Sequence, residues 1–239
     1  MTARPIFHPR KRMSEVARSV ALTALFLVGT AGLEAQIVIW DVNAKTASAN
    51  NPLVASTLDL RLSAATLTLG SGVTASATAS TFGASGFDKT SLASALSAGD
   101  YLSFTVTPAS GSSFSLSSMT LLFGVATAVT NFNVALASSA SGFNAGNELW
   151  SLSFNTASPA AQTIALASVS TLQNSAAAVE FRLYGWRDIT GTTTFRIRDN
   201  SGGDLSISGT TSAIPEPAAY AALVGLAGLA LVAWRKRRP

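Results

Sequence analysis

The stretch YLSFTVTP, residues 101–108, decides the fold class because apolar and hydroxyl-bearing side chains alternate along it. The two sides carry different residues: Leu102, Phe104 and Val106 against Ser103, Thr105 and Thr107. Successive side chains of a β-strand point to opposite faces, so the pattern predicts a strand that buries one face.

The same alternation recurs along the chain, interrupted by segments rich in Gly, Pro, Asn, Asp and Ser. The further stretches are FSLSSMTLLF (114–123), NFNVALAS (131–138), LWSLSF (149–154), VEFRLYGW (179–186), TTFRIRD (193–199) and DLSISG (204–209). Many short strands with regular turn signals predict an all-β sandwich or barrel. We therefore predict a single β-sandwich domain over residues 36–212.

Three segments of this domain receive more specific expectations. Residues 193–209 are expected to form a hairpin, with Phe195 and Ile197 facing inward and Leu205 and Ile207 returning beside them. Residues 91–99, SLASALSAG, fit a helical turn and an Ala/Ser-rich loop equally well. Residues 70–85 are low in complexity and fit a weak edge strand or a flexible loop.

The N-terminal segment has the layout of a secretory signal peptide over residues 1–35. Arg10, Lys11, Arg12 and Arg18 precede an apolar stretch at 20–33, and Ala35 offers a small residue for cleavage. An uncleaved N-terminal anchor is the alternative. Translation could start at Met1 or at Met13, because Arg18 supplies positive charge in either case.

The C-terminal segment, residues 213–239, combines three features. Pro215, Glu216 and Pro217 come first, and an uncharged apolar run at 218–234 follows, close to the minimum length of a transmembrane helix. A basic cluster then ends the chain: Arg235, Lys236, Arg237 and Arg238. Positive charge resists translocation, so we expect this end to stay cytoplasmic. A buried core helix with a solvated basic tail is the alternative.

These three features, in this order, resemble a PEP-CTERM sorting signal, a tail found on exported proteins of Gram-negative bacteria. The resemblance implies that an exosortase, an integral-membrane Cys transpeptidase-like enzyme, recognises Pro215, Glu216 and Pro217 and removes the helix. The two prolines keep that tripeptide extended, a form that a protease can bind. The run from residues 99–108 through 131–146 to 179–186 is also similar to jelly-roll-like ectodomains that precede such tails, and residues 135–143 resemble them most.

The exported domain has a different net charge from the whole chain, because the two terminal segments carry most of the basic residues. The whole chain has 16 Lys and Arg against 12 Asp and Glu, which is typical of a nucleic-acid-binding protein. Between residues 36 and 214, however, seven basic residues face nine acidic ones. The basic excess therefore belongs to the two sorting segments, and we expect no nucleic-acid partner.

Catalysis by a histidine or a cysteine is excluded for the exported domain. The chain has no Cys, and its one histidine, His8, lies within the predicted signal peptide. A Ser-His-Asp triad, a Cys-His pair and an ordinary zinc site therefore cannot form. A glycosidase needs two carboxylates, for which Glu148 and Glu180 are the glutamate candidates. An ion pair with a neighbouring strand is the simpler role for Glu180.

Two weaker candidate sites remain. Asp199 and Asp204 flank the stretch DNSGGD, whose oxygen atoms could wrap Ca²⁺, although the EF-hand spacing and its bidentate Glu are missing. A polar hairpin turn is the simpler interpretation. Tyr184 and Trp186 share strand parity with Glu180 and would suit a carbohydrate patch, unless a second layer covers them.

From these residues we expect an exported, non-catalytic protein of the cell surface or extracellular matrix, with a structural or adhesive role and no cofactor. A carbohydrate-binding module and, further off, a glycoside-acting enzyme are the alternatives. The expected partners are signal peptidase and an exosortase during export, and extracellular polysaccharide afterwards.

Overall fold

The strands of the chain assemble into three sheets. This computed structural model describes residues 35–127, 131–199 and 203–215, together with residues 224, 225, 229 and 235. The chain divides after Leu33 into two units, and all described residues belong to the second. The predicted signal peptide, apart from Ala35, and most of the predicted membrane helix therefore lie outside the described residues.

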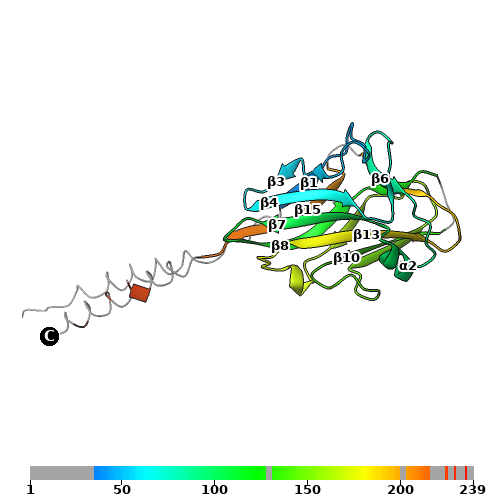
Figure 1. The fold of residues 1–239 in the computed structure, drawn as a ribbon. Coiled ribbons are helices and arrows are strands. Elements are labelled where there is room, and N and C mark those ends of the chain that lie inside the picture. The colour runs from blue at the N-terminus through cyan, green and yellow to red at the C-terminus, as the bar shows by residue number, and fades with distance from the viewer. Residues whose placement is uncertain are drawn as a thin grey trace, which may run out of the picture. The chain divides into compact units, whose positions relative to one another are not determined.

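Two larger sheets and one smaller sheet carry the fold (Figure 1). The five-stranded sheet contains, in spatial order, β12 (Gln162–Ala165), β8 (Ser112–Leu121), β15 (Leu205–Ala213), β1 (Ala35–Trp40) and β3 (Thr57–Leu58). The six-stranded sheet contains β11 (Trp150–Phe154), β10 (Phe132–Ser138), β13 (Val179–Arg187), β7 (Tyr101–Pro108), β4 (Leu62–Leu69) and β2 (Leu53–Val54). The four-stranded sheet contains β5 (Thr74–Ala75), β6 (Thr81–Ser85), β14 (Thr194–Arg198) and β9 (Phe123–Val125).

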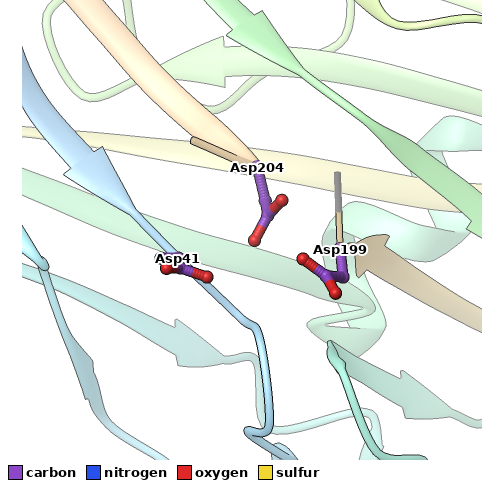
Figure 2. A group of neighbouring side chains, drawn as sticks. All are labelled: Asp41, Asp199 and Asp204. Atoms are coloured by element: carbon purple, nitrogen blue, oxygen red, sulfur yellow. The ribbon is translucent and has the colours of Figure 1, made fainter. Parts of the chain in front are cut away.

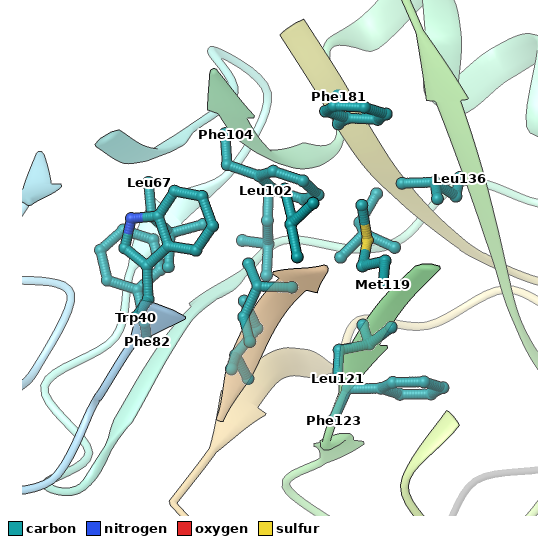
Figure 3. Packing of buried hydrophobic residues seen from close by; sticks show 14 of the residues in the cluster. Trp40, Leu67, Phe82, Leu102, Phe104, Met119, Leu121, Phe123, Leu136 and Phe181 are labelled. Atoms are coloured by element: carbon teal, nitrogen blue, oxygen red, sulfur yellow. The ribbon is translucent and has the colours of Figure 1, made fainter. Parts of the chain in front are cut away.

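One apolar core joins the sheets (Figure 3). Trp40 of β1 packs edge to face on Phe104 of β7, with ring centroids 5.5 Å apart. Phe132 of β10 stacks on Phe195 of β14 at 5.4 Å. Because rings from different sheets meet in this layer, the described residues form an all-β, sandwich-like domain, and the prediction of an all-β fold is confirmed.

The alternation along β7 behaves as predicted. Leu102, Phe104 and Val106 are fully buried, while Thr105 and Thr107 are half-buried on the opposite side. The strand bounds follow the predicted stretch, Tyr101–Pro108. The turn after β7 leads to β8, which lies in the other large sheet, so β7 and β8 do not pair as a hairpin.

The predicted hairpin at residues 193–209 is wrong. Phe195, Ile197, Leu205 and Ile207 are buried as expected, but β14 and β15 do not pair with each other. Both run antiparallel to β8 and its continuation β9, so the chain keeps its direction. Leu122, between β8 and β9, accepts a hydrogen bond from the backbone nitrogen of Arg198 and donates one to the backbone oxygen of Asp204, so β14 and β15 adjoin the same stretch of chain.

The segment at residues 91–99 is a helix. α2 (Leu92–Ala98) begins with Ser91, whose hydroxyl accepts from the backbone nitrogen of Ser94, and ends at Gly99 in the left-handed region, with φ of 78°. Ser at an N-cap and Gly after the last turn are standard end signals. α2 packs against β13 (Figure 1). A 3-10 turn (Ser170–Leu172) is the other short helical element among the fully described segments.

The low-complexity stretch at residues 70–85 contains both β5 and β6. β5 is the weak edge strand that the sequence allowed. β6 lies inside the four-stranded sheet and buries Phe82 and Ala84 completely, so this half of the stretch belongs to the core.

Candidate functional site: a hollow on the six-stranded sheet and a carboxylate cluster

Alternate residues of β13 line the outer face of the six-stranded sheet, and the end nearer Glu180 is closed. The guanidinium of Arg182 lies between the rings of Tyr101 and Phe143, at 4.4 and 3.9 Å from their centroids. Its nitrogens donate to the two carboxylate oxygens of Glu180 at 2.7 and 3.2 Å. The expected ion pair of Glu180 therefore forms with a residue of the same strand rather than across strands.

Tyr184 does not offer a stacking face. Its residue is 1% exposed, and its ring meets that of Tyr101 edge to face at 5.3 Å. Arg182 donates to its hydroxyl at 3.4 Å. Burial raises the pKa of the Tyr184 hydroxyl. Of the two possibilities that the sequence left open for Tyr184, an exposed face or cover by other parts of the chain, the structure has the covered one.

Trp186, two residues further along, lines an open hollow of about 250 Å³. Its side chain is half-buried, and Asn133 of β10 is its cross-strand neighbour. Leu92 of α2 lines the hollow on one side and Glu148, just before β11, on another. Trp186 and Glu148, singled out for different reasons in the sequence, thus meet in one place.

The floor of the hollow is held by a polar network that the sequence did not reveal. Asn133, 6% exposed, donates from Nδ2 to Oδ1 of Asp188 at 2.7 Å. The hydroxyl of Ser153, on the facing strand β11, donates to Oδ1 of Asn133. Ala135 leaves room beside them. Asn133 lies in the predicted strand 131–138, but nothing in the sequence distinguishes it from a solvent-facing Asn.

Glu148 and Glu180 differ in their surroundings. One oxygen of Glu148 accepts from the backbone nitrogen of Gly146 at 2.9 Å, and Gly146 has φ of 93°, which favours glycine. Glu148 lines the hollow, whereas Glu180 is bound by Arg182 and is not among the described lining residues. The two glutamate candidates are therefore not gathered around one cavity.

The weak calcium candidates Asp199 and Asp204 do come together, and Asp41 joins them (Figure 2). One oxygen from each lies within 4.8 Å of the others. Asp199 directly follows β14, Asp204 directly precedes β15, and Asp41 follows β1, whose Trp40 pairs with Leu205. Carboxylate oxygens are the ligands that Ca²⁺ takes, so this cluster could hold a cation.

The hydrogen bonds of the cluster also account for part of its geometry. Asp204 is fully buried and accepts from the backbone nitrogen of Val42 at 2.6 Å. Asp41 is exposed and accepts from the backbone nitrogen of Asn43 at 2.8 Å. These bonds fix two of the carboxylates at the end of β1 independently of any ion. The sequence did not point to Asp41, because only the folding of the chain brings this residue close to Asp204.

Asp100 is a further acidic group that sequence reasoning missed. It directly follows α2 and its cap, its residue is fully buried, and neither carboxylate oxygen has a hydrogen-bond partner among the described residues. The Nζ of Lys89 lies 3.9 Å from Oδ2. Burial raises the pKa of Asp100 to about 6, while Lys89 opposes that shift. An Asp after Gly99 reads like an ordinary turn residue, so no sequence signal marks it.

The sorting segment lies mainly outside the described residues. Pro215 and Arg235 are described, whereas Glu216, Pro217, Lys236, Arg237 and Arg238 are not. No helix found in the described parts of the chain is both long and apolar enough to cross a membrane. The predicted span at 218–234 includes only residues 224, 225 and 229 among those described.

Comparison with known proteins identifies this segment. Residues 213–238 match the family described as the PEP-CTERM protein-sorting motif. The motif indicates a secreted protein that is targeted to an exosortase, with transit through the membrane. The match covers the tail alone. No curated protein and no solved structure matches the chain.

Proposed function

We propose that the chain is an exported, non-catalytic protein of the cell surface or extracellular matrix with a structural or adhesive role. The PEP-CTERM motif at 213–238 supports export and exosortase processing. The adhesive role is carried by one observation, namely that an edge strand of each large sheet is unguarded. Edge strands present unpaired backbone groups to other chains.

These two edge strands are β11, WSLSF, and β12, QTIA, and the opposite edges are formed by β2 and β3, which have two residues each. Neither contains a Lys, a Pro or any charged residue, which are the usual means of preventing edge-to-edge association. The outward side chains of both are small or polar, as in Ser151, Ser153 and Thr163. Such edges suit association with a second chain or with a hydroxyl-rich polymer.

The experiment compares the processed protein with an edge variant, Thr163→Lys/Ala165→Lys, in the matrix fraction of the producing cells. Both side chains are exposed, so the fold is expected to persist. The variant is expected to move to the soluble fraction, because two ammonium groups oppose pairing at β12. Ala93→Lys/Ser97→Lys, at two exposed positions of α2, is the matched control because it adds the same charge. Equal retention of all three proteins would overturn the adhesive role of the edges.

Export itself is tested by the intact mass of the secreted protein. Cleavage near Ala35 and near Pro215–Pro217 would leave one mass that reports both events. A secreted protein retaining Pro239 would contradict exosortase processing.

Carbohydrate binding is the second candidate function, and the position of Trp186 in an open hollow favours it. A glycoside-acting enzyme is the weaker alternative. It would need two carboxylates near one bond, and Glu148 and Glu180 lie in different surroundings.

A further inference from the structure

The hollow beside Trp186 combines an aromatic side chain with fixed polar atoms. We propose that it binds an uncharged polysaccharide, without cleaving it, and that it excludes anionic ones. This inference rests on the carbohydrate-binding function proposed above as the second candidate, because it names the class of polymer that the hollow would bind.

The aromatic contact comes from Trp186. The residue is half-buried and lines the hollow together with Leu92 of α2, so part of the residue is buried while the rest stays accessible. A ring held in this way provides apolar contact area at low conformational cost. The C–H faces of a sugar ring match such a surface, whereas the buried Tyr184 next to it offers none.

The polar atoms of the hollow are mainly acceptors. The hydroxyl hydrogen of Ser153 is committed to Oδ1 of Asn133, which leaves the lone pairs of Ser153 for a ligand. One oxygen of Glu148 binds the backbone nitrogen of Gly146, and the second takes no hydrogen bond from the described residues. Acceptors of this kind suit a ligand that has many hydroxyl donors.

Charge then selects among sugar chains. The described residues that line the hollow include Glu148 but no Lys or Arg. A uronate or sulfate group would approach a carboxylate without a compensating cation, and like charges at short range repel. A neutral chain has no such penalty, and its hydroxyl groups can donate to Glu148.

Binding without cleavage follows from the number of carboxylates. Glu148 is the one carboxylate among the described lining residues, and Glu180 is engaged with Arg182 at 2.7 Å. Hydrolysis by an acid and base pair needs a second carboxyl group at the scissile bond. The described lining residues therefore include groups that can recognise a sugar but no second carboxyl group that could act with Glu148 in hydrolysis.

The test measures binding of the processed protein to soluble neutral glucans, galactomannan and chitin oligosaccharides, and to alginate and polygalacturonate as anionic chains. Trp186→Ala is expected to weaken neutral binding at least about tenfold, as for an anchoring aromatic residue. Trp186→Phe keeps an aromatic ring and is expected to retain most of the binding. Ser97→Ala, on the exposed side of α2, is the control and should bind like the unaltered protein.

Glu148→Gln tests the selectivity and does not depend on the behaviour of Trp186→Ala. It is expected to weaken neutral binding several-fold and to strengthen binding of alginate, since the repelling charge is gone. Three results would each overturn the proposal. The protein could bind only anionic chains, it could bind no neutral chain, or Trp186→Ala could keep its fold and bind neutral chains as the unaltered protein does. If Trp186→Ala binds neutral chains normally and only the Thr163→Lys/Ala165→Lys protein loses matrix retention, the proposal for the hollow is wrong. The adhesive role of the edge strands is then still supported.

Discussion

The two ends of the outer face of β13 carry half-buried residues of the same strand parity, Arg182 and Trp186, whose surroundings differ. At one end Arg182 is enclosed by the rings of Tyr101 and Phe143 and bonded to Glu180. At the other end Trp186 faces an open hollow. The difference lies in what each side chain contacts, and we call the Arg182 end closed and the Trp186 end open. At the closed end two aromatic rings and a carboxylate engage the guanidinium, whereas at the open end Trp186 lines a hollow together with Leu92 of α2.

This contrast shows that strand parity tells which side a residue takes but not whether solvent reaches it. Tyr184 lies between the two ends and is 1% exposed, although its parity is that of Trp186. Short covering elements therefore determine which part of a sheet face can bind a partner. The closed end stabilises the fold, and the open end is available for a ligand.

The largest effect that separates the two ends is on stability. Tyr184→Ala is expected to lower the free energy of unfolding by at least about 3 kcal/mol, because a fully buried aromatic side chain leaves a cavity. Trp186→Ala removes a half-buried side chain and should cost less than about 2 kcal/mol. Urea denaturation of both variants checks the order. Equal losses would show that Trp186 is as enclosed as Tyr184.

The stability of the folded protein is expected to depend on pH through Asp100, the buried residue that follows α2 and its cap. Its folded-state pKa of about 6 lies above the ordinary value of 3.8. The folded protein therefore binds a proton more tightly than the unfolded chain does. The free energy of unfolding should fall by up to about 3 kcal/mol as the pH rises from about 4 to about 6.

Denaturation at a series of pH values measures this slope. The groups that face Asp100 are Lys89 and Asp88, which oppose and reinforce the shift respectively. Asp100→Asn should remove most of the slope, whereas Asp88→Asn, at an exposed carboxylate, should keep it. A profile that stays flat in the unaltered protein between pH 4 and 6 would contradict the burial of a carboxyl group at this position.

The closed end should show a measurable coupling between Phe143 and Arg182. The guanidinium lies 3.9 Å from the ring centroid, and such contacts contribute about 1 kcal/mol. A double-mutant cycle with Phe143→Ala and Arg182→Ala is expected to give a coupling of that size. The matched cycle of Phe143→Ala with Trp186→Ala should be additive. Coupling in the second cycle but not in the first would reverse the assignment of the two ends.

The smallest effect concerns the three carboxylates of Asp41, Asp199 and Asp204, away from the hollow. In EDTA, Asp199→Asn should raise the free energy of unfolding by about 0.5 kcal/mol, because it relieves like-charge repulsion at an exposed site. Calorimetry of the variant and the unaltered protein, in EDTA and in Ca²⁺, measures this difference in stability. If the variant is the less stable of the two in Ca²⁺, the cluster holds the cation. Sugar binding should be the same in both proteins.

Much of the fold could be predicted because strand periodicity is local. The alternation of Leu102, Phe104 and Val106 predicts β7 and its buried side, and Trp40 is in the core as expected. Pairing was harder, since the turn-like residues between β14 and β15 indicated a hairpin, whereas the two strands pair with β9 and β8 instead of with each other. Only the register with β8 and β9 distinguishes the two arrangements, and register depends on distant residues.

The candidate site was predicted in part. Trp186 and Glu148 were identified from residue type, and the structure places both at one hollow. The floor residues Asn133 and Ser153 have no local signature, because their role depends on pairing between β10, β11 and β13. Asp100 was missed for a related reason, since burial of an acidic residue after a helix cap cannot be deduced from its neighbours in the chain.

The most direct test of the open and closed ends is an NMR titration of the processed protein with the neutral polysaccharide that it binds. The indole N–H resonance of Trp186, assigned with Trp186→Phe, should shift progressively with ligand. The Nε–H resonance of Arg182 should stay in place. A shift confined to Arg182, or an indole resonance that does not move at saturation, would contradict the account.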